Sequence, residues 1–172
     1  VQKIESMRES GKDPAAVSSE IKSVYDNIRT IKGFEHINPM NVGIGSAIFA
    51  NKPGDGSARE QAASCQRVLG TWANFAKEYA TKRYRSNLIN WGMIPFIVNG
   101  EPIFNKDEYV FIPNLKTSIL NSEKEIKAYV LGDTNKQFTL SVGYLTNDEE
   151  KIIVAGCIIN YNQSKVKMGT SK

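Results

Sequence analysis

The sequence has few of the side chains that build metal centres and nucleophilic triads. Only two of its 172 residues are cysteine, Cys65 and Cys157, and one is histidine, His36. The cysteines lie far apart and form no CxxC or Cys/His pair, which excludes a structural zinc site, a self-contained iron–sulfur site and a disulfide framework. A single histidine excludes a His-based triad. We therefore expect no metal site within this chain, and a reducing compartment, the cytoplasm.

Long apolar runs and a strong charge of one sign are also missing. No apolar run approaches the roughly 20 residues of a membrane span, and no signal-peptide pattern is present. Lysine and arginine outnumber the acidic residues by 22 to 18, a formal charge of +4, which is too small to require nucleic acid or a membrane as partner. Because the chain starts at Val1 rather than methionine, we expect a piece of a longer protein.

The length and overall composition of the chain are those of one globular domain. A length of 172 residues is about one domain, and the hydrophobic and charged shares of 41% and 23% are ordinary. Apolar runs alternate with helical periodicity over 46–91, the order of elements in an α/β layer. Residues 137–145 alternate apolar and polar side chains, as in a half-buried antiparallel strand. We predict a mixed α/β domain over 34–172 and a helical extension over 1–33.

The extension contains the clearest helical pattern. Asp13 and Pro14 are typical of a helix start, and Lys32 and Gly33 of a helix end. Between them, apolar side chains recur at spacings of 4, 3, 4 and 3 residues: Val17, Ile21, Val24, Ile28 and Ile31. This spacing predicts an amphipathic helix whose apolar face is buried.

A second helix is predicted from Ser57 to Gly70. Small apolar side chains recur every three to four residues in this segment and form a stripe that we expect to face the core: Ala58, Ala62, Cys65 and Leu69. Ser57 and Glu60 have the spacing of a capping box, which predicts Ser57 as the N-cap. A third helix is predicted over 78–91, ending at Gly92.

The C-terminal part contains a second capping-box pattern. Thr146 and Glu149 precede the apolar residues 152–154, so a short helix is predicted there. The tail from Ser164 onward is polar, and we expect it to be frayed.

The loop that leads into the second helix contains the candidate catalytic and ligand-binding residues. Gly54 and Gly56 let the backbone bend and approach a ligand closely. A helix N-terminus attracts carboxylate or phosphate groups, and Arg59 adds a fork suited to a carboxylate although it opposes the helix dipole. Ser57 has two interpretations, helix cap or reactive serine, and the spacing leaves both open. The loop matches neither a Walker A motif nor a GxSxG elbow.

The loop sequence is similar to that of a known family. Residues 54–63 read Gly-Asp-Gly-Ser-Ala-Arg-Glu-Gln-Ala-Ala and resemble the glycine–serine–serine–arginine–glutamate motif of the aconitase superfamily's C-terminal swivel domain. Further segments resemble that domain in the same order: 67–70, 86–96 and 145–161. Within the superfamily, 52–67 and 79–86 are most similar to a group of uncharacterised aconitase-like hydratases. The resemblance spans about 42–162.

The resemblance implies both a fold and a reaction. The fold would be the three-layer β/β/α swivel domain of the aconitase C-terminus and of the isopropylmalate isomerase small subunit. The activity would be that of a hydro-lyase, which moves water across a double bond of a small di- or tricarboxylic acid. In such enzymes three cysteines of other domains hold a [4Fe-4S] cluster. This chain would then carry no cofactor, would have the cluster-bearing domains of the same full-length protein as partners, and would be inactive alone.

The resemblance also implies roles for single residues. Ser57 would be the catalytic base and Arg59 the carboxylate ligand, with Gly56 and Ala58 beside the substrate. Where the family usually has a second serine this chain has Ala58, so a hydroxyl contact is missing and either the acid differs or activity has been lost. The family uses a further arginine upstream, for which Arg29 is the candidate, the alternative being a solvated position on its helix.

A second hypothesis, from a different functional class, also stays open. The chain could be a non-catalytic carboxylate- or RNA-binding module that retains the fold, and Ala58 favours this alternative. Basic residues interleaved with Tyr79 and Tyr84 fit an RNA-binding patch, although such charges usually form the solvated face of a helix: Lys77, Lys82, Arg83 and Arg85. We do not expect a nucleic-acid partner. Cys65 and Cys157 are interpreted as small buried residues rather than ligands, and His36 as a loop residue.

Overall fold

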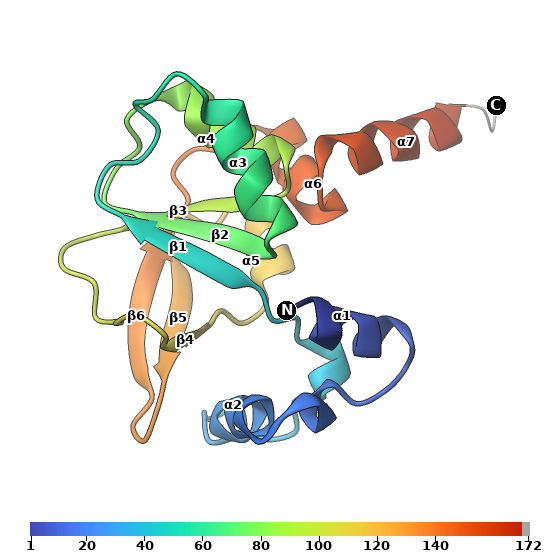
Figure 1. The fold of residues 1–172 in the computed structure, drawn as a ribbon, viewed down its shortest axis with the longest axis vertical. Helices are drawn as coiled ribbons and strands as arrows, with labels where there is room; N and C mark the ends of the chain where they lie inside the picture. The colour runs from blue at the N-terminus through green and yellow to red at the C-terminus, as the bar shows by residue number, and fades with distance from the viewer. Residues whose placement is uncertain (170–172) are drawn as a thin grey trace. The chain divides into compact units, whose positions relative to one another are not determined.

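The strands of the computed structural model, which describes residues 1–169, are hydrogen-bonded in the order β1-β2-β3-β6-β5-β4 (Figure 1). β1, β2 and β3 are parallel neighbours, whereas β3 with β6 and β4 with β5 are antiparallel. The strand bounds are β1 Ser46–Ala50, β2 Thr71–Ala76, β3 Ile94–Val98, β4 Tyr109–Phe111, β5 Ile126–Leu131 and β6 Lys136–Ser141. The mixed α/β class predicted from the sequence is confirmed.

Along the chain, a helix lies between β1 and β2, between β2 and β3, and between β4 and β5 (Figure 1). Their bounds are α1 Gln2–Glu9, α2 Ser19–Arg29, α3 Arg59–Val68, α4 Lys82–Asn90, α5 Leu115–Leu120, α6 Asn147–Ala155 and α7 Ile158–Gly169, with 3-10 turns η1 Pro14–Val17 and η2 Pro39–Asn41. None of the helices within residues 1–169 is both long and apolar enough to cross a membrane.

The chain divides into two compact units, each made of three segments. The first unit comprises 1–45, 102–113 and 127–138. The second comprises 46–101, 114–126 and the chain from 139 onward. The boundary predicted at residue 33 stays a prediction.

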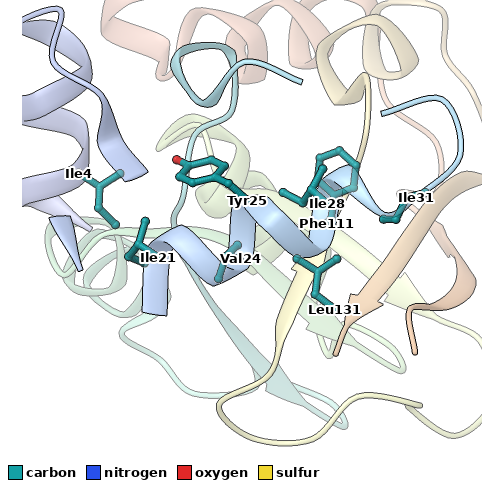
Figure 2. Packing of buried hydrophobic residues seen from close by; sticks show 8 residues of the cluster. All are labelled: Ile4, Ile21, Val24, Tyr25, Ile28, Ile31, Phe111 and Leu131. Carbon is teal, nitrogen blue, oxygen red and sulfur yellow. The ribbon is translucent and has the colours of Figure 1, made fainter. Parts of the chain in front are cut away.

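The first unit has its own hydrophobic core, shown in Figure 2. The apolar face predicted for the N-terminal helix is confirmed in this core, where α2 places Ile21, Val24 and Ile28 at no more than 7% exposure. The helix is not continuous, however. Asp13 caps only the 3-10 turn η1, and Ser18, in extended backbone, caps α2 by accepting a hydrogen bond from the Ile21 amide. A second capping side chain therefore splits the predicted helix in two.

The second unit contains the parallel strands β1, β2 and β3 together with α3 and α4. In this unit α3 contacts β2, α4 contacts β3, and the two helices contact each other. Their shared core consists of Ala63, Tyr84, Leu88 and Met93. The elements that carry the predicted motif thus belong to one packed layer.

The C-terminal capping box is confirmed and the frayed tail is not. Thr146 accepts a hydrogen bond from the Glu149 amide, and the Glu149 carboxylate accepts one from the Thr146 amide. The tail predicted to fray from Ser164 is helical in α7 as far as Gly169. The Lys165 ammonium forms an ion pair with Asp148 of α6 at 3.9 Å and lies 4.3 Å from the ring centre of buried Tyr161, and these contacts tie the tail to α6. Residues 170–172 of the predicted tail lie outside the described residues.

The apolar stripe predicted for α3 faces solvent instead of the core. Ala58, Ala62 and Cys65 are exposed, and Leu69 is 79% exposed. The buried apolar residue of this helix is Ala63, and the polar Gln66 on its inner side pairs with Tyr84. Because a small residue and an amide make the contact with the core, periodicity alone selected the wrong face.

Candidate functional site

The loop singled out from the sequence lies at the carboxyl end of the parallel strands. Residues 51–58 follow β1, and residues 77–81 follow β2 and precede α4. Since β1 and β2 are parallel neighbours, both loops leave the same edge of the sheet. Ligands of open α/β sheets bind outside this edge. The topology therefore places the predicted motif where such a fold binds ligands.

The first half of the loop is fastened to the loop after β2. The Glu78 amide donates to the Asn51 carbonyl at 3.1 Å, and the Ala80 amide donates to the Pro53 carbonyl at 2.9 Å. The Lys52 ammonium forms an ion pair with the Glu78 carboxylate at 2.8 Å. The two loops are consequently held together as far as Pro53.

Gly54 is the last residue of the loop that is held in this way. Its carbonyl accepts a hydrogen bond from the Thr81 hydroxyl at 2.9 Å. Its φ of +98° lies in the left-handed region, and a Cβ at this position would lie 2.5 Å from ring atoms of Tyr84. The backbone bend and close approach predicted for this glycine are both present, although the partner is Tyr84.

The predicted capping box of Ser57 and Glu60 is wrong. α3 begins at Arg59, with Ala58 as N-cap and no side-chain cap hydrogen bond, so Ser57 lies before the helix and is exposed. The Glu60 carboxylate accepts a hydrogen bond from the Trp91 indole N–H at 2.6 Å. Because Trp91 engages the carboxylate that would close the box, Ser57 has no capping partner and the cap interpretation of this serine is removed.

Arg59 combines a fixed position with a charge that is not paired. Its Nε donates to the Gly56 carbonyl at 2.7 Å, which leaves the two terminal nitrogens for other acceptors. Within residues 1–169 no acidic side chain forms an ion pair with it, whereas Lys52 pairs with Glu78 and Lys77 pairs with Glu101. The arrangement therefore offers an arginine fork to an incoming anion.

A buried polar network supports the site from below. Tyr84 is 3% exposed. Its hydroxyl accepts hydrogen bonds from the side-chain amides of Gln66 at 3.0 Å and Asn74 at 3.1 Å. The Tyr79 hydroxyl donates to the carbonyls of Asn74 and Phe96, both at 3.0 Å, and burial raises the pKa of Tyr79 far above its ordinary value. Tyr79 therefore stays a neutral donor that ties the end of β2 to β3.

Sequence reasoning missed Thr81 and Tyr84 as parts of this site. The predicted helix over 78–91 begins at Lys82 instead, with Thr81 as its N-cap. A threonine before a basic and aromatic helical segment is a recognisable cap signal. No pattern in the sequence, however, indicates that the same hydroxyl reaches Gly54.

The other candidate residues are not part of these two loops. Arg29, in the first unit, forms an ion pair with Asp26 of its own helix at 2.9 Å, which agrees with the solvated-position interpretation. His36 is exposed in a loop. In the basic segment, Arg85 is held by the carbonyls of Val142 and Tyr144. Since that arginine is used within the protein and the Tyr84 ring is buried, the segment is a poor match to a base-stacking surface.

The described residues do not provide a ligand set for an iron–sulfur cluster. No group of three or more histidine, cysteine, aspartate or glutamate side chains within residues 1–169 is placed to hold a metal. Cys65 is exposed and Cys157 is partly buried, so the expected burial of Cys65 is wrong.

Comparison with known proteins identifies the family. The model of the Aconitase C-terminal domain family matches residues 5–101, more than half of the chain. The chain belongs to the aconitase C-terminal domain family. The match begins inside the predicted N-terminal extension and includes β1 to β3 and the Gly54–Arg59 loop. The resemblance stated from the motifs is confirmed.

Two relatives of this aconitase C-terminal domain support the same assignment. The methanogen homoaconitase small subunit of Methanocaldococcus jannaschii is 30% identical over 141 residues, which are 81% of this chain and 75% of that protein. The crystal structure of 3-isopropylmalate dehydratase from the same organism matches with a TM-score of 0.57 and 28% identity, covering 77% of this chain and 71% of that one. The predicted swivel-domain fold is confirmed by this match.

Proposed function

We propose that this chain is the swivel component of an aconitase-like hydro-lyase acting on a small di- or tricarboxylic acid. Ser57 would be the base and Arg59 the ligand of a substrate carboxylate, with Gly56 and Ala58 beside the substrate. One observation carries the proposal: Arg59 is held by the Gly56 carbonyl, is not paired with an acid within the described residues, and lies two residues from an exposed serine. The names of the relatives, homoaconitase and isopropylmalate dehydratase, support the reaction class.

The reaction assigns one proton transfer to Ser57. As the alkoxide, its oxygen takes the proton from the carbon next to a carboxylate, and the electron pair of that C–H bond forms the carbon–carbon double bond. The C–O bond on the neighbouring carbon breaks, and its hydroxyl group leaves as hydroxide and takes up one proton to become water. Release of the proton from Ser57 restores the base, so the net products are the unsaturated acid and one water. Hydration is the same sequence in reverse.

The local electrostatics favour this use of a serine. A serine is a weak base unless its alkoxide is stabilised. Ser57 lies just before the N-terminus of α3, where unpaired amides and the helix dipole favour negative charge, and Arg59 adds a full positive charge. A substrate carboxylate bound to Arg59 would place the adjacent C–H bond near the serine.

The proposal requires a cluster-bearing partner, since the described residues do not form a ligand set for the cluster. The resemblance implies that this partner is another domain of the same full-length protein. The name of one relative, a small subunit, favours a separate large subunit. Ala58 would remove one hydroxyl from the substrate contacts, and we propose that it shifts the preference among acids.

The test uses the chain purified together with its cluster-bearing partner and with the cluster reconstituted. The assembly is assayed with citrate, isocitrate, 2-methylcitrate, homocitrate and 3-isopropylmalate. Ser57→Ala is expected to lower kcat by about 10²–10⁴-fold, the usual contribution of a positioned base. Arg59→Lys is expected to raise KM, because a lysine cannot form the two parallel hydrogen bonds.

The matched control is Ser64→Ala, a serine of α3 whose hydroxyl donates to the Gln61 carbonyl of the same helix. It is expected to leave turnover unchanged. Unaltered turnover in Ser57→Ala would contradict the base assignment. Binding of these acids without turnover by any of the assemblies would instead support a non-catalytic carboxylate-binding module.

A further inference from the structure

We infer that Thr81 is a positioning residue for Ser57, and this inference rests on the proposed function. Thr81 lies in the loop after β2 and is partly buried. Its hydroxyl donates to the Gly54 carbonyl at 2.9 Å and accepts from the Tyr84 amide at 3.2 Å. One hydroxyl group thus caps α4 and holds the segment that leads to the base.

The Thr81 contact is the last one before the loop becomes exposed. Up to Pro53 the loop is fixed by backbone hydrogen bonds to the neighbouring loop. Asp55, Gly56 and Ser57 are exposed. The next hydrogen bond along the chain is that from the Arg59 Nε to the Gly56 carbonyl. The position of Ser57 is consequently set by two anchors, one on each side, and Thr81 supplies the first.

Tyr84 restricts the backbone conformation of Gly54, which accepts the Thr81 hydrogen bond. The ring of Tyr84 lies so close to Gly54 that a Cβ there would be 2.5 Å away. Gln66 and Asn74 hold the Tyr84 hydroxyl, so the ring has little freedom to move. Gly54 is therefore confined between the Tyr84 ring and the Thr81 hydroxyl, and loss of the hydroxyl releases the carbonyl on one side.

Three substitutions separate the two roles of the Thr81 hydroxyl. Thr81→Ser keeps both the cap and the donor. Thr81→Asp keeps the cap, because aspartate is a good N-cap, but an ionised carboxylate cannot donate to the Gly54 carbonyl. Thr81→Val keeps the shape and removes both. Lys82→Gln, at an exposed neighbouring position, changes the local charge by the same single unit as Thr81→Asp and is the charge control.

The first measurement is amide hydrogen exchange of Glu78 and Ala80 in the full chain, because these amides donate to the Asn51 and Pro53 carbonyls of the loop that Thr81 holds. Thermal unfolding is recorded in parallel. Thr81→Asp is expected to speed exchange of these two loop amides at least 10-fold and to leave the exchange of α4 as in the parent. Thr81→Ser and Lys82→Gln are expected to match the parent in both segments. Equal loop exchange in the parent and in Thr81→Asp would overturn the inference, whatever the activity.

The second measurement is turnover in the assembly with the cluster-bearing partner. A displacement of about 1 Å at a catalytic group can lower the rate about 100-fold, so Thr81→Asp is expected to lower kcat 10- to 100-fold with a smaller change in KM. A purely structural role would lower the unfolding temperature, most in Thr81→Val, without this split between kcat and KM. A rise in KM alone, shared with Lys82→Gln, would overturn the positioning role.

The two failures are distinguishable. If the assembly hydrates none of the acids tested, the proposed function fails, and the hydrogen-exchange result still decides whether Thr81 anchors the loop. If Ser57→Ala abolishes turnover while Thr81→Asp keeps full kcat, the proposed function stands and the positioning role of Thr81 is wrong.

Discussion

At the scale of single residues, two glycines of the second unit bring the ends of two helices close together. Gly92 follows α4 with a φ of +70°, and a Cβ placed there would overlap the carbonyl group of Gly156, the C-cap of α6. Both the left-handed backbone and the absence of a side chain are required at this position. The ends of α4 and α6 approach as closely as they do because Gly92 carries no Cβ, whereas a Cβ at Gly156 would meet only the Asn160 side chain, at 3.7 Å.

Gly92→Ala is expected to lower the free energy of unfolding by about 2–5 kcal/mol, the sum of backbone strain and overpacking. The control is Gly100→Ala, which has a similar φ of +80° but no atom within 4 Å of the added Cβ. It should lose only about 1–2 kcal/mol, the cost of the left-handed conformation. Urea unfolding of both variants measures the difference, and equal losses would show that the contact with Gly156 relaxes freely.

At the scale of elements, two segments with the same capping-box spacing behave differently. In α6 the box is closed, since the Glu149 carboxylate accepts from the Thr146 amide at 2.8 Å. In α3 it is open, because Trp91 binds Glu60 and the helix begins after Ser57. The same local pattern therefore stabilises one helix and contributes nothing to the start of the other.

Thr146→Ala is expected to lower the free energy of unfolding by about 0.5–2 kcal/mol, as for other lost N-caps. Ser57→Ala should change it by less than about 0.5 kcal/mol, as for an exposed residue without a cap. Thr146→Ser, which keeps the cap, is the control. Denaturant unfolding measures all three variants, and a loss in Ser57→Ala as large as that in Thr146→Ala would contradict the observed helix start.

At the scale of the whole molecule, three buried or half-buried tyrosines make stability depend on pH in the alkaline range. Burial raises the pKa of Tyr25 and of Tyr79, and burial together with the hydrogen bond to Glu20 raises the pKa of Tyr109 to about 12. In the unfolded chain a tyrosine loses its proton near pH 10. Above that pH the unfolded state binds fewer protons than the folded state, so the free energy of unfolding falls as pH rises.

The expected result is a stability that these tyrosines leave constant below about pH 9 and lower progressively from about pH 10. The part due to Tyr109 continues to about pH 12. Urea unfolding at a series of pH values measures the slope. Tyr109→Phe should flatten part of that slope, because the phenol that titrates is gone. A slope identical to that of the parent would show that Tyr109 does not contribute.

Much of the fold could be predicted because its signals are local. The strands 71–76 and 94–98 coincide with apolar runs and are largely buried, and the buried face of α2 follows its 3.6-residue period. The strand 46–50 also coincides with an apolar run, but four of its five residues are exposed. The face of α3 could not be predicted in this way. Its contact with the core is made by Ala63 and the amide of Gln66, which carry almost no hydrophobic signal.

The strands 46–50, 71–76 and 94–98, the closed cap at Thr146 and membership of the family could be predicted from the sequence, because each depends on residues within a few positions or on motifs in order along the chain. The start of α3 and the contacts that hold the loop before Ser57 depend on tertiary contacts instead. The contact of Trp91 with Glu60 joins residues 31 positions apart, and that of Thr81 with Gly54 joins residues 27 apart. The pairing of Thr81 with Gly54 arises because the parallel strands β1 and β2 bring successive loops to one edge of the sheet. The pairing of Trp91 with Glu60 joins α4 to α3, which contact each other.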